Sequence, residues 1–282
     1  MVPLEPLEPL YSAAAGDPLP LPAELRRLCG TLAFRPRGAR PRVAANFVST
    51  LDGVVDLGAP GKQGGGAISG FSRHDRMVMG VLRAAADAVV VGAGTLRSVP
   101  RHIWTAEYIF PDLADEYRTL RARLGKAGHP LNVFVTARGA IDFDAPVFRA
   151  GDVPVLVVTT AEGARRARDA GPPAGVSLAV AAGGELIAAG AVLDAIVRVR
   201  PCGLVLLEGG PRLMGDFFAE KCLDELFLTI APQVAGRDGS IERPGFVAGK
   251  RFAPESPRWG TLSGVKRGGN FLFLRYAFPA EK

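Results

Sequence analysis

Two short glycine-containing turns have the residue types and spacing that could hold a phosphorylated ligand. In the first, the apolar residues 89–91 end at Gly92, and Gly94 and Thr95 follow. Glycine lets the backbone turn sharply and lets an anion approach main-chain N–H groups, and a following helix start adds a favourable dipole. A full dinucleotide fingerprint would have a third glycine where Arg97 stands. A tight strand-to-helix turn that binds nothing therefore stays open as an alternative.

A second turn repeats the same design. The apolar residues 203–207 are followed by Glu208, Gly209, Gly210 and Pro211. Proline suits the first turn of a helix, so we expect a helix over residues 212–221. Two glycine-ended strands in one α/β chain predict two backbone walls around one extended anionic ligand, for which a nucleotide is the natural candidate.

Polar residues near the end of an earlier strand form a third candidate group. Residues 43–49 predict a buried strand that carries Asn46 and Ser49, and Asp52 lies in the turn that follows. Side chains at the C-terminal ends of strands face the crevice in which open α/β sheets bind ligands. Asp52 could alternatively be only the turn residue of Leu-Asp-Gly.

Asp75 falls in the first turn of a helix that we expect over residues 73–86. The helix dipole alone would favour a carboxylate there, so a ligand is not required to explain it. The preceding segment, residues 58–70, is too rich in glycine for regular structure, and we interpret it as a mobile cover on the site, with a flexible spacer as the alternative.

The order of these elements predicts the fold class. Strands alternate with helices along residues 42–221, which is typical of a mostly parallel α/β sheet with helices on both faces. The strands before and after residues 73–86 are expected to pair in parallel through a right-handed crossover. Residues 1–41 predict an N-terminal arm with one short helix over 23–29, and residues 42–282 one domain. The other expected strands are 87–91, 131–136, 153–160 and 176–180, the other helices are 113–124, 161–169 and 185–198, and antiparallel strands 223–230, 260–266 and 271–278 close one edge.

Composition restricts the class of protein. The 282 residues are 48% hydrophobic and 22% charged, and no apolar run is long enough to span a membrane. The formal charge of +6 comes from dispersed residues that do not interleave with aromatic ones, so we expect no nucleic-acid partner. Cys29, Cys202 and Cys222 lack metal-type spacing, which favours buried thiols and no bound metal. With no secretory signal at the start, the expectation is a cytoplasmic protein without a membrane partner.

Five motifs together resemble one family. They occur in the order and spacing of the reductase domain of bacterial riboflavin biosynthesis, and the resemblance covers residues 42–278. It implies the dihydrofolate reductase fold, NADPH as cofactor, and hydride transfer to an imine-like carbon of an aminopyrimidine ribosyl phosphate or a dihydropterin. The motifs are residues 46–53, 75–76 with 82–84, 87–95, 207–211, and 224–226 with 229–232.

The resemblance also implies residue roles. Gly92, Gly94 and Thr95 would lie along the cofactor pyrophosphate, and Glu208, Gly209, Gly210 and Pro211 would form the second wall. Thr136 and Arg138 would bind an adenosine phosphate, although a plain surface arginine is equally compatible with the sequence. Asn46, Ser49 and Asp52 would face the substrate. Asp75, the candidate catalytic residue, would pair its carboxylate with the amino-pyrimidine edge.

Two departures from the family pattern leave the substrate open. The family has a Trp-Ile pair where this chain has Ala67 and Ile68, and Asp-Pro followed by Leu-x-Arg where residues 98–101 read Ser-Val-Pro-Arg. Those family residues are associated with the ribosyl phosphate. The chain also lacks the His/Cys zinc pattern of a deaminase. We expect a stand-alone, homodimeric reductase of a small molecule; a non-catalytic nucleotide-binding protein and a phosphoribosyl transferase remain alternatives.

Overall fold

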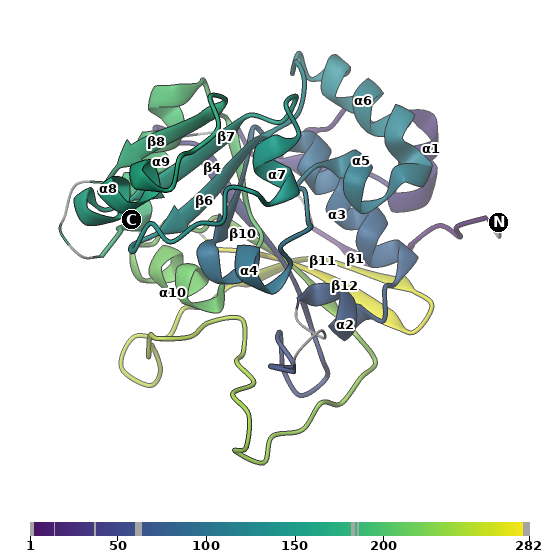
Figure 1. Ribbon diagram of the computed structural model, residues 1–282. Helices are drawn as coiled ribbons and strands as arrows, with labels where there is room; N and C mark the ends of the chain where they lie inside the picture. The colour runs from purple at the N-terminus through teal and green to yellow at the C-terminus, as the bar shows by residue number, and fades with distance from the viewer. Residues whose placement is uncertain are drawn as a thin grey trace.

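A large, mostly parallel sheet organises the chain (Figure 1). The computed structural model describes residues 3–13, 15–36, 38–59, 64–181, 184 and 186–278, and in these residues ten strands form this sheet in the order β1-β11-β12-β10-β4-β9-β5-β6-β7-β8. Its strands are β1 (Glu8–Ser12), β4 (Arg42–Ser49), β5 (Ala88–Gly92), β6 (Leu131–Thr136), β7 (Val155–Thr159), β8 (Val176–Val180), β9 (Leu204–Leu207), β10 (Glu225–Ile230), β11 (Thr261–Gly268) and β12 (Phe271–Ala277).

The parallel strands consist mostly of apolar residues because both faces of the sheet are covered. Along β5, Val89 and Val91 join the core on one face and Val90 joins the core on the other, as alternation along a strand requires. The first face packs against α1 (Ala23–Cys29), α3 (Arg73–Ala85), α5 (Ala106–Ile109), α6 (Ala114–Arg123) and α7 (Pro146–Arg149). The second packs against α9 (Ala189–Val199) and α10 (Pro211–Ala219). The remaining helices are α2 (Gly65–Ser69), α4 (Ala93–Ser98), α8 (Ala161–Asp169) and the short η1 (Pro111–Leu113).

The α/β class is confirmed, with corrections to the pairing. β4 and β5 are parallel but do not pair with each other, because β9 from much later in the chain lies between them. Likewise β10 pairs in parallel with β4 and antiparallel with β12, so the antiparallel part of this edge begins only after β10. Local patterns fix which residues are strands but carry no information on which strand is inserted between two others.

The glycine-rich segment also differs from the prediction. Residues 65–69, within the stretch expected to be irregular, form the short helix α2, which Gly70 ends in the left-handed conformation with φ 55°. Residues 60–63 of this segment, like Glu185 at the predicted start of α9, lie outside the described residues.

The N-terminal segment is more structured than the single predicted helix. Helix α1 forms over the predicted residues, and β1 adds an edge strand that pairs antiparallel with β11. A separate two-stranded ladder joins β2 (Asp17–Pro18) to β3 (Ala33–Phe34). Leu21, Leu25 and Leu28 are almost fully buried against the domain, so this segment contributes to its core. No helix in the described part of the chain is both long and apolar enough to cross a membrane.

Candidate active site

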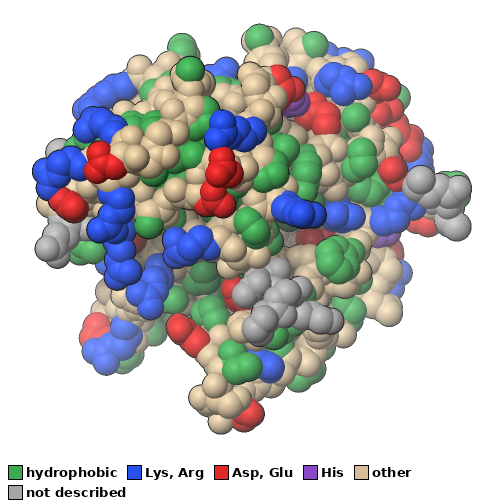
Figure 2. Space-filling model, viewed as in Figure 1, with side chains coloured by type: hydrophobic (Ala, Val, Ile, Leu, Met, Phe, Trp, Pro, Cys, Tyr) green, Lys and Arg blue, Asp and Glu red, His purple; other side chains and the backbone are tan. Residues whose placement is uncertain are grey.

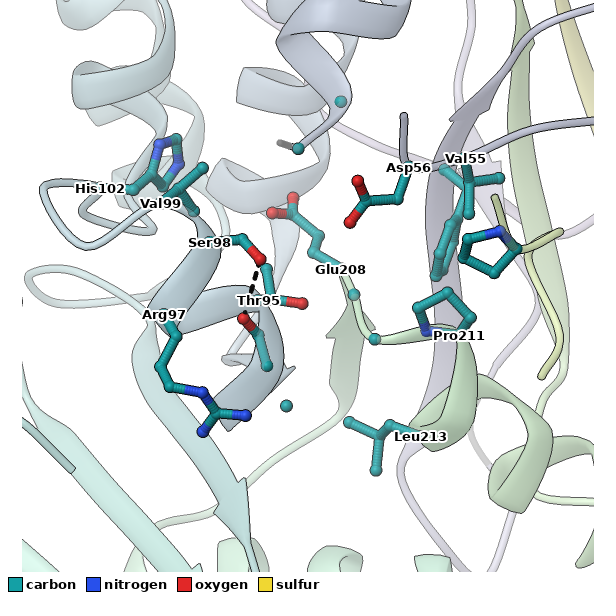
Figure 3. A pocket seen from close by; sticks show the side chains of 18 of the residues that line it. Val55, Asp56, Thr95, Arg97, Ser98, Val99, His102, Glu208, Pro211 and Leu213 are labelled. Atoms are coloured by element: carbon teal, nitrogen blue, oxygen red, sulfur yellow. Dashed lines mark hydrogen bonds between the residues drawn. The ribbon is translucent and has the colours of Figure 1, made fainter. Parts of the chain in front are cut away.

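One large cavity lies at the C-terminal ends of β4, β9, β5 and β6 (Figure 3). Its volume is about 1580 Å³, which exceeds the several hundred Å³ of a typical small-ligand site. The structure brings most of the predicted site residues to its wall: Asn46, Asp75, Gly92, Gly94, Thr95, Thr136, Arg138, Glu208, Gly209, Gly210 and Pro211. Residues separated by more than 150 positions in the chain therefore face one space.

The two glycine turns are in direct contact. The backbone N–H of Gly92 donates to the carbonyl oxygen of Gly209 at 3.2 Å. Gly209 has φ 149°, and a Cβ atom there would lie 2.8 Å from Oγ1 of Thr95. Because neither the conformation nor the space admits a side chain, glycine is required at residue 209.

The residues around these turns fit the phosphates of a dinucleotide. A Cβ on Gly94 would meet nothing within 4 Å, so its backbone borders open space. The nine-residue helix α10 begins at Pro211, and Gly210, which precedes it, has no side chain to cap the helix N–H groups. Those N–H groups are suited to an anion. The exposed arginines Arg97 and Arg212 line the same region together with the predicted Arg138.

A buried ion pair holds the floor of the cavity. Arg83 of α3 donates from Nε to both carboxylate oxygens of Glu208 at 3.0 Å, and from Nη2 to Oε2 at 2.7 Å. The two side chains are 1% and 4% exposed. Arg83 also donates to the carbonyl oxygen of Thr105 at 3.1 Å. Glu208, which was predicted as part of the cofactor wall, therefore also connects the end of β9 to α3. Arg83 is a positioning residue, to which the sequence assigned no role beyond its place in the Leu-Arg-Ala motif.

His102 completes this network as a neutral ring. Nη2 of Arg83 lies 2.9 Å from Nε2 of His102. Burial, followed by the charge of Arg83, lowers the pKa of His102 to about 2, so the ring accepts a hydrogen bond and stays uncharged. His74, by contrast, has Nε2 2.8 Å from the carbonyl oxygen of Glu5 and does not line the cavity.

Asp75, in the first turn of α3, is a buried carboxyl group in the cavity wall. Its residue is 4% exposed, and its backbone N–H is capped by Oγ of Ser72 at 3.4 Å. Burial raises the pKa of Asp75 to about 6; the nearby hydroxyls of Thr229 and Ser69 oppose the rise, and the charge of Glu208 adds to it. A carboxyl group with a pKa near neutrality can hold or release a proton under ordinary conditions.

Two further side chains that line the cavity were not singled out in the sequence. Ser69, 2% exposed, ends α2 against the cavity, and its Oγ has no hydrogen-bond partner among the described residues. Asp56 lines the opposite wall, with Oδ1 accepting from the N–H of Gly58 at 2.9 Å. Ser69 was not predicted as a site residue because residues 58–70 were expected to be irregular. A helix as short as α2 shows no periodicity in the sequence.

Ser49 and Asp52 do not line the cavity. Oδ1 of Asp52 accepts from Oγ1 of Thr50 at 2.6 Å, and its carboxylate also accepts from the N–H groups of Ala235 and Gly236. Oγ of Ser49 donates to the carbonyl oxygen of Thr50 at 3.1 Å. The structure therefore supports the alternative interpretation of Asp52 as a turn residue, and it places Ser49 at the end of β4 beside this turn.

One known protein family matches most of the chain, including the glycine turns and Asp75. The sequence model of the RibD C-terminal domain family matches residues 41–259. The chain belongs to the RibD C-terminal domain family. A search among curated proteins gave no match.

Solved structures of RibD-type proteins share this fold. A pyrimidine reductase-like protein from Corynebacterium diphtheriae is 22% identical with a TM-score of 0.65, covering 86% of this chain and 93% of that one. The riboflavin biosynthesis reductase of Saccharomyces cerevisiae is 16% identical with a TM-score of 0.57, covering 87% and 93%. A diaminohydroxyphosphoribosylaminopyrimidine deaminase/5-amino-6-(5-phosphoribosylamino)uracil reductase from Thermotoga maritima is 19% identical with a TM-score of 0.60, covering 85% of this chain but 57% of that one.

Membership of the RibD C-terminal domain family supports an oxidoreductase related to the pyrimidine reductases of riboflavin biosynthesis. The matched range includes the cavity residues from Asn46 to Gln233 as well as the loop that carries Glu242. It does not include the N-terminal segment up to residue 40.

Proposed function

We propose that this protein is an NADPH-dependent reductase that transfers hydride to an imine-like carbon of an aminopyrimidine or a dihydropterin. The observation that carries the proposal is that the paired glycine turns and the buried Asp75 open onto one cavity. The glycine turns would bind the phosphates of the cofactor and Asp75 would hold a proton. A cofactor and a substrate bound side by side in the cavity would contact both.

The glycine turns and the arginines beside them would hold the cofactor. The backbone at Gly92, Gly94 and Gly210 and the side chain of Thr95 would border the pyrophosphate, with the start of α10 directed at its charge. Thr136, Arg97, Arg138 and Arg212 would lie around the adenosine phosphate, whose charge matches guanidinium groups.

The substrate would lie against β4, α2 and the start of α3. Asn46 is 6% exposed at the cavity wall, and Ser69 and Asp75 line the same cavity. A carboxylate paired with two N–H donors binds an aminopyrimidine edge with defined geometry. Ser69 adds one hydroxyl that can donate or accept, which would fix the orientation of the ring.

The chain itself contributes orientation, exclusion of water and one proton. Reduced nicotinamide supplies the hydride when bound. Asp75 would orient the ring and hold the proton that the imine nitrogen takes up, because its pKa of about 6 keeps part of the population protonated near neutrality. The pair of Arg83 and Glu208 keeps α3, and therefore Asp75, in a fixed position relative to the turn at Gly209.

The proposal is tested by following NADPH absorbance with purified protein. We expect oxidation when 5-amino-6-(5-phosphoribosylamino)uracil, its dephosphorylated form or a dihydropterin is added, and slower oxidation when NADH replaces NADPH. Replacing Arg138 by Ala should reduce the difference in rate between NADPH and NADH. Tight NADPH binding without turnover of any of these substrates would instead favour a non-catalytic nucleotide-binding protein.

A further inference from the structure

The charged side chains of the cavity are separated by sign. Arg97, Arg138 and Arg212 line the part over β5 and β6 and at the start of α10. The side chains of these three residues form no ion pair or hydrogen bond with another described residue, although the structure contains many side-chain ion pairs elsewhere. We call this part the phosphate end, and its three guanidinium groups have no acidic partner among the described residues.

The opposite part is lined by three acidic side chains. Asp56, Asp75 and Glu242 line it, and none of them forms an ion pair with a described residue. Figure 3 shows the Asp56 carboxylate directed into the space that Glu208 also faces, whereas the Arg97 guanidinium extends away from both. We call this part, over β4 and β10, the substrate end.

The segments that carry two of these acids are held together. The N–H of Val55, next to Asp56, donates to the carbonyl oxygen of Pro244 at 3.0 Å. A Cβ on Gly58 would lie 2.8 Å from the carbonyl oxygen of Glu242. The two acidic side chains therefore belong to one wall formed by two loops in contact.

Little positive charge opposes these acids. Of the arginines that line the cavity, Arg83 is already paired with Glu208, and Arg76 lies over the Phe71 ring at 5.8 Å from its centroid. Among the described residues that line the cavity, Arg76 is thus the one guanidinium left at the substrate end. Gln233, whose Oε1 is buried without a hydrogen-bond partner among the described residues, adds a further acceptor there.

We propose that the substrate end selects substrates whose part remote from the reacting ring is uncharged or cationic, and discriminates against those that carry a phosphate or carboxylate there. This inference rests on the proposed function and identifies its substrate class. An anionic group would approach two acids, Asp56 and Glu242, with Arg76 as the one unpaired guanidinium among the described lining residues at this end. Juxtaposition of like charges in a partly desolvated site is unfavourable. Hydroxyl and amino groups, in contrast, would find acceptors in these side chains.

Two matched substrate pairs test this selection. One pair is 5-amino-6-(5-phosphoribosylamino)uracil and its dephosphorylated form; the other is dihydrofolate, which has carboxylates on its tail, and dihydrobiopterin, which has a neutral tail. With NADPH in excess, we expect kcat/KM to favour the neutral member of each pair by at least about tenfold at low salt, and the ratio to fall as salt screens the charges.

A double variant locates the effect. Asp56→Asn with Glu242→Gln keeps the shape of both side chains and removes both charges, so the preference for the neutral member should shrink several-fold. The matched control is Glu255→Gln, an acid of the same loop region that pairs with Arg251 at the surface and does not line the cavity. It should leave both ratios unchanged.

Binding measurements separate this inference from the proposed function. Calorimetry with the same four compounds ranks their affinities for the protein, alone and saturated with NADP⁺, which cannot supply hydride, so that binding is measured without turnover. Absence of turnover with a preserved ranking would overturn the proposed function alone. Equal or tighter binding of the anionic member in either pair, or a ranking that the double variant does not alter, would overturn the charge-selection proposal.

Discussion

Asp75 combines a buried position with an ionisable group that has no ion-pair partner among the described residues. Burial of such a group is unfavourable in the ionised form, which is why its pKa rises to about 6. The sequence identified the residue through its place at a helix start and its family motif. The sequence could not show the burial, because that depends on Thr229 and Ser69 reaching the same point from other elements.

The proposed role of Asp75 predicts the effect of Asp75→Asn on activity. The amide keeps the size of the side chain but can neither accept a pair of N–H donors with a full charge nor hold the transferred proton. We expect kcat/KM to fall by at least about 100-fold, the order of a lost general acid or base. NADPH affinity, measured by fluorescence quenching, should change little. Unchanged steady-state kinetics would contradict this role.

The same residue predicts a pH dependence of stability. Because the folded-state pKa of about 6 lies above the ordinary value of 3.8, the folded protein binds more protons than the unfolded chain between these pH values. The free energy of unfolding should therefore fall as pH rises from about 4 to about 6, by about 3 kcal/mol in total from this group.

Asp75→Asn should remove that fall. Urea unfolding of the ligand-free protein at several pH values measures it, and the variant should be the more stable form at pH 7 and nearly equal to the wild type at pH 4. A parallel pH dependence in both proteins would show that another group is responsible.

At the scale of elements, the two glycine turns are interlocked. The sequence predicted each turn and its strand, since glycine and proline mark such points strongly. It gave no sign that Gly92 and Gly209 would be hydrogen-bonded, because β9 takes its place beside β5 only through the pairing of the whole sheet. Nor could it show that Glu208 would meet Arg83, which lies 125 residues earlier.

Gly209→Ala should disturb this contact. The backbone conformation with φ 149° strains any other residue by about 1 to 3 kcal/mol, and the added Cβ would press on Thr95. We expect a lower melting temperature and a large loss of NADPH affinity.

Gly94→Ala is the control for stability, because its Cβ would meet no atom within 4 Å and its φ is not in the left-handed region. It should fold as the wild type does. Weaker NADPH binding by this well-folded variant would support cofactor contact at the turn, whereas wild-type affinity would argue against it.

At the scale of the whole molecule, the alternation of strands and helices was predictable, and most element boundaries agree with the pattern to within a few residues. The strand order was not, since it depends on contacts between distant parts of the chain. The positive charges are dispersed as expected: Figure 2 shows Lys and Arg in separate groups among acidic and apolar side chains on the face displayed. The sequence predicted too little structure and burial for the N-terminal segment, because its many prolines are typical of an irregular surface segment.

The buried leucines of α1 predict that this segment stabilises the fold. Leu25 is fully buried, so Leu25→Ala should lower the free energy of unfolding by about 2 to 5 kcal/mol. Its exposed neighbour Arg26 provides the control, since Arg26→Ala should change it by no more than about 0.5 kcal/mol. Urea unfolding measures both, and equal effects would mean that α1 is only loosely attached.

The pairing of β1 with β11 has a consequence for how the chain assembles. Residues 8–12 are made long before their partner, residues 261–268. The parallel pair of β4 and β10 also joins distant parts of the chain, since Ala44 is the partner of Glu225. Such distant pairings form slowly, because long loops must close before the contacts stabilise them. During synthesis β1 therefore has no partner in this sheet until β11 has been made, and this side of the sheet is completed only then.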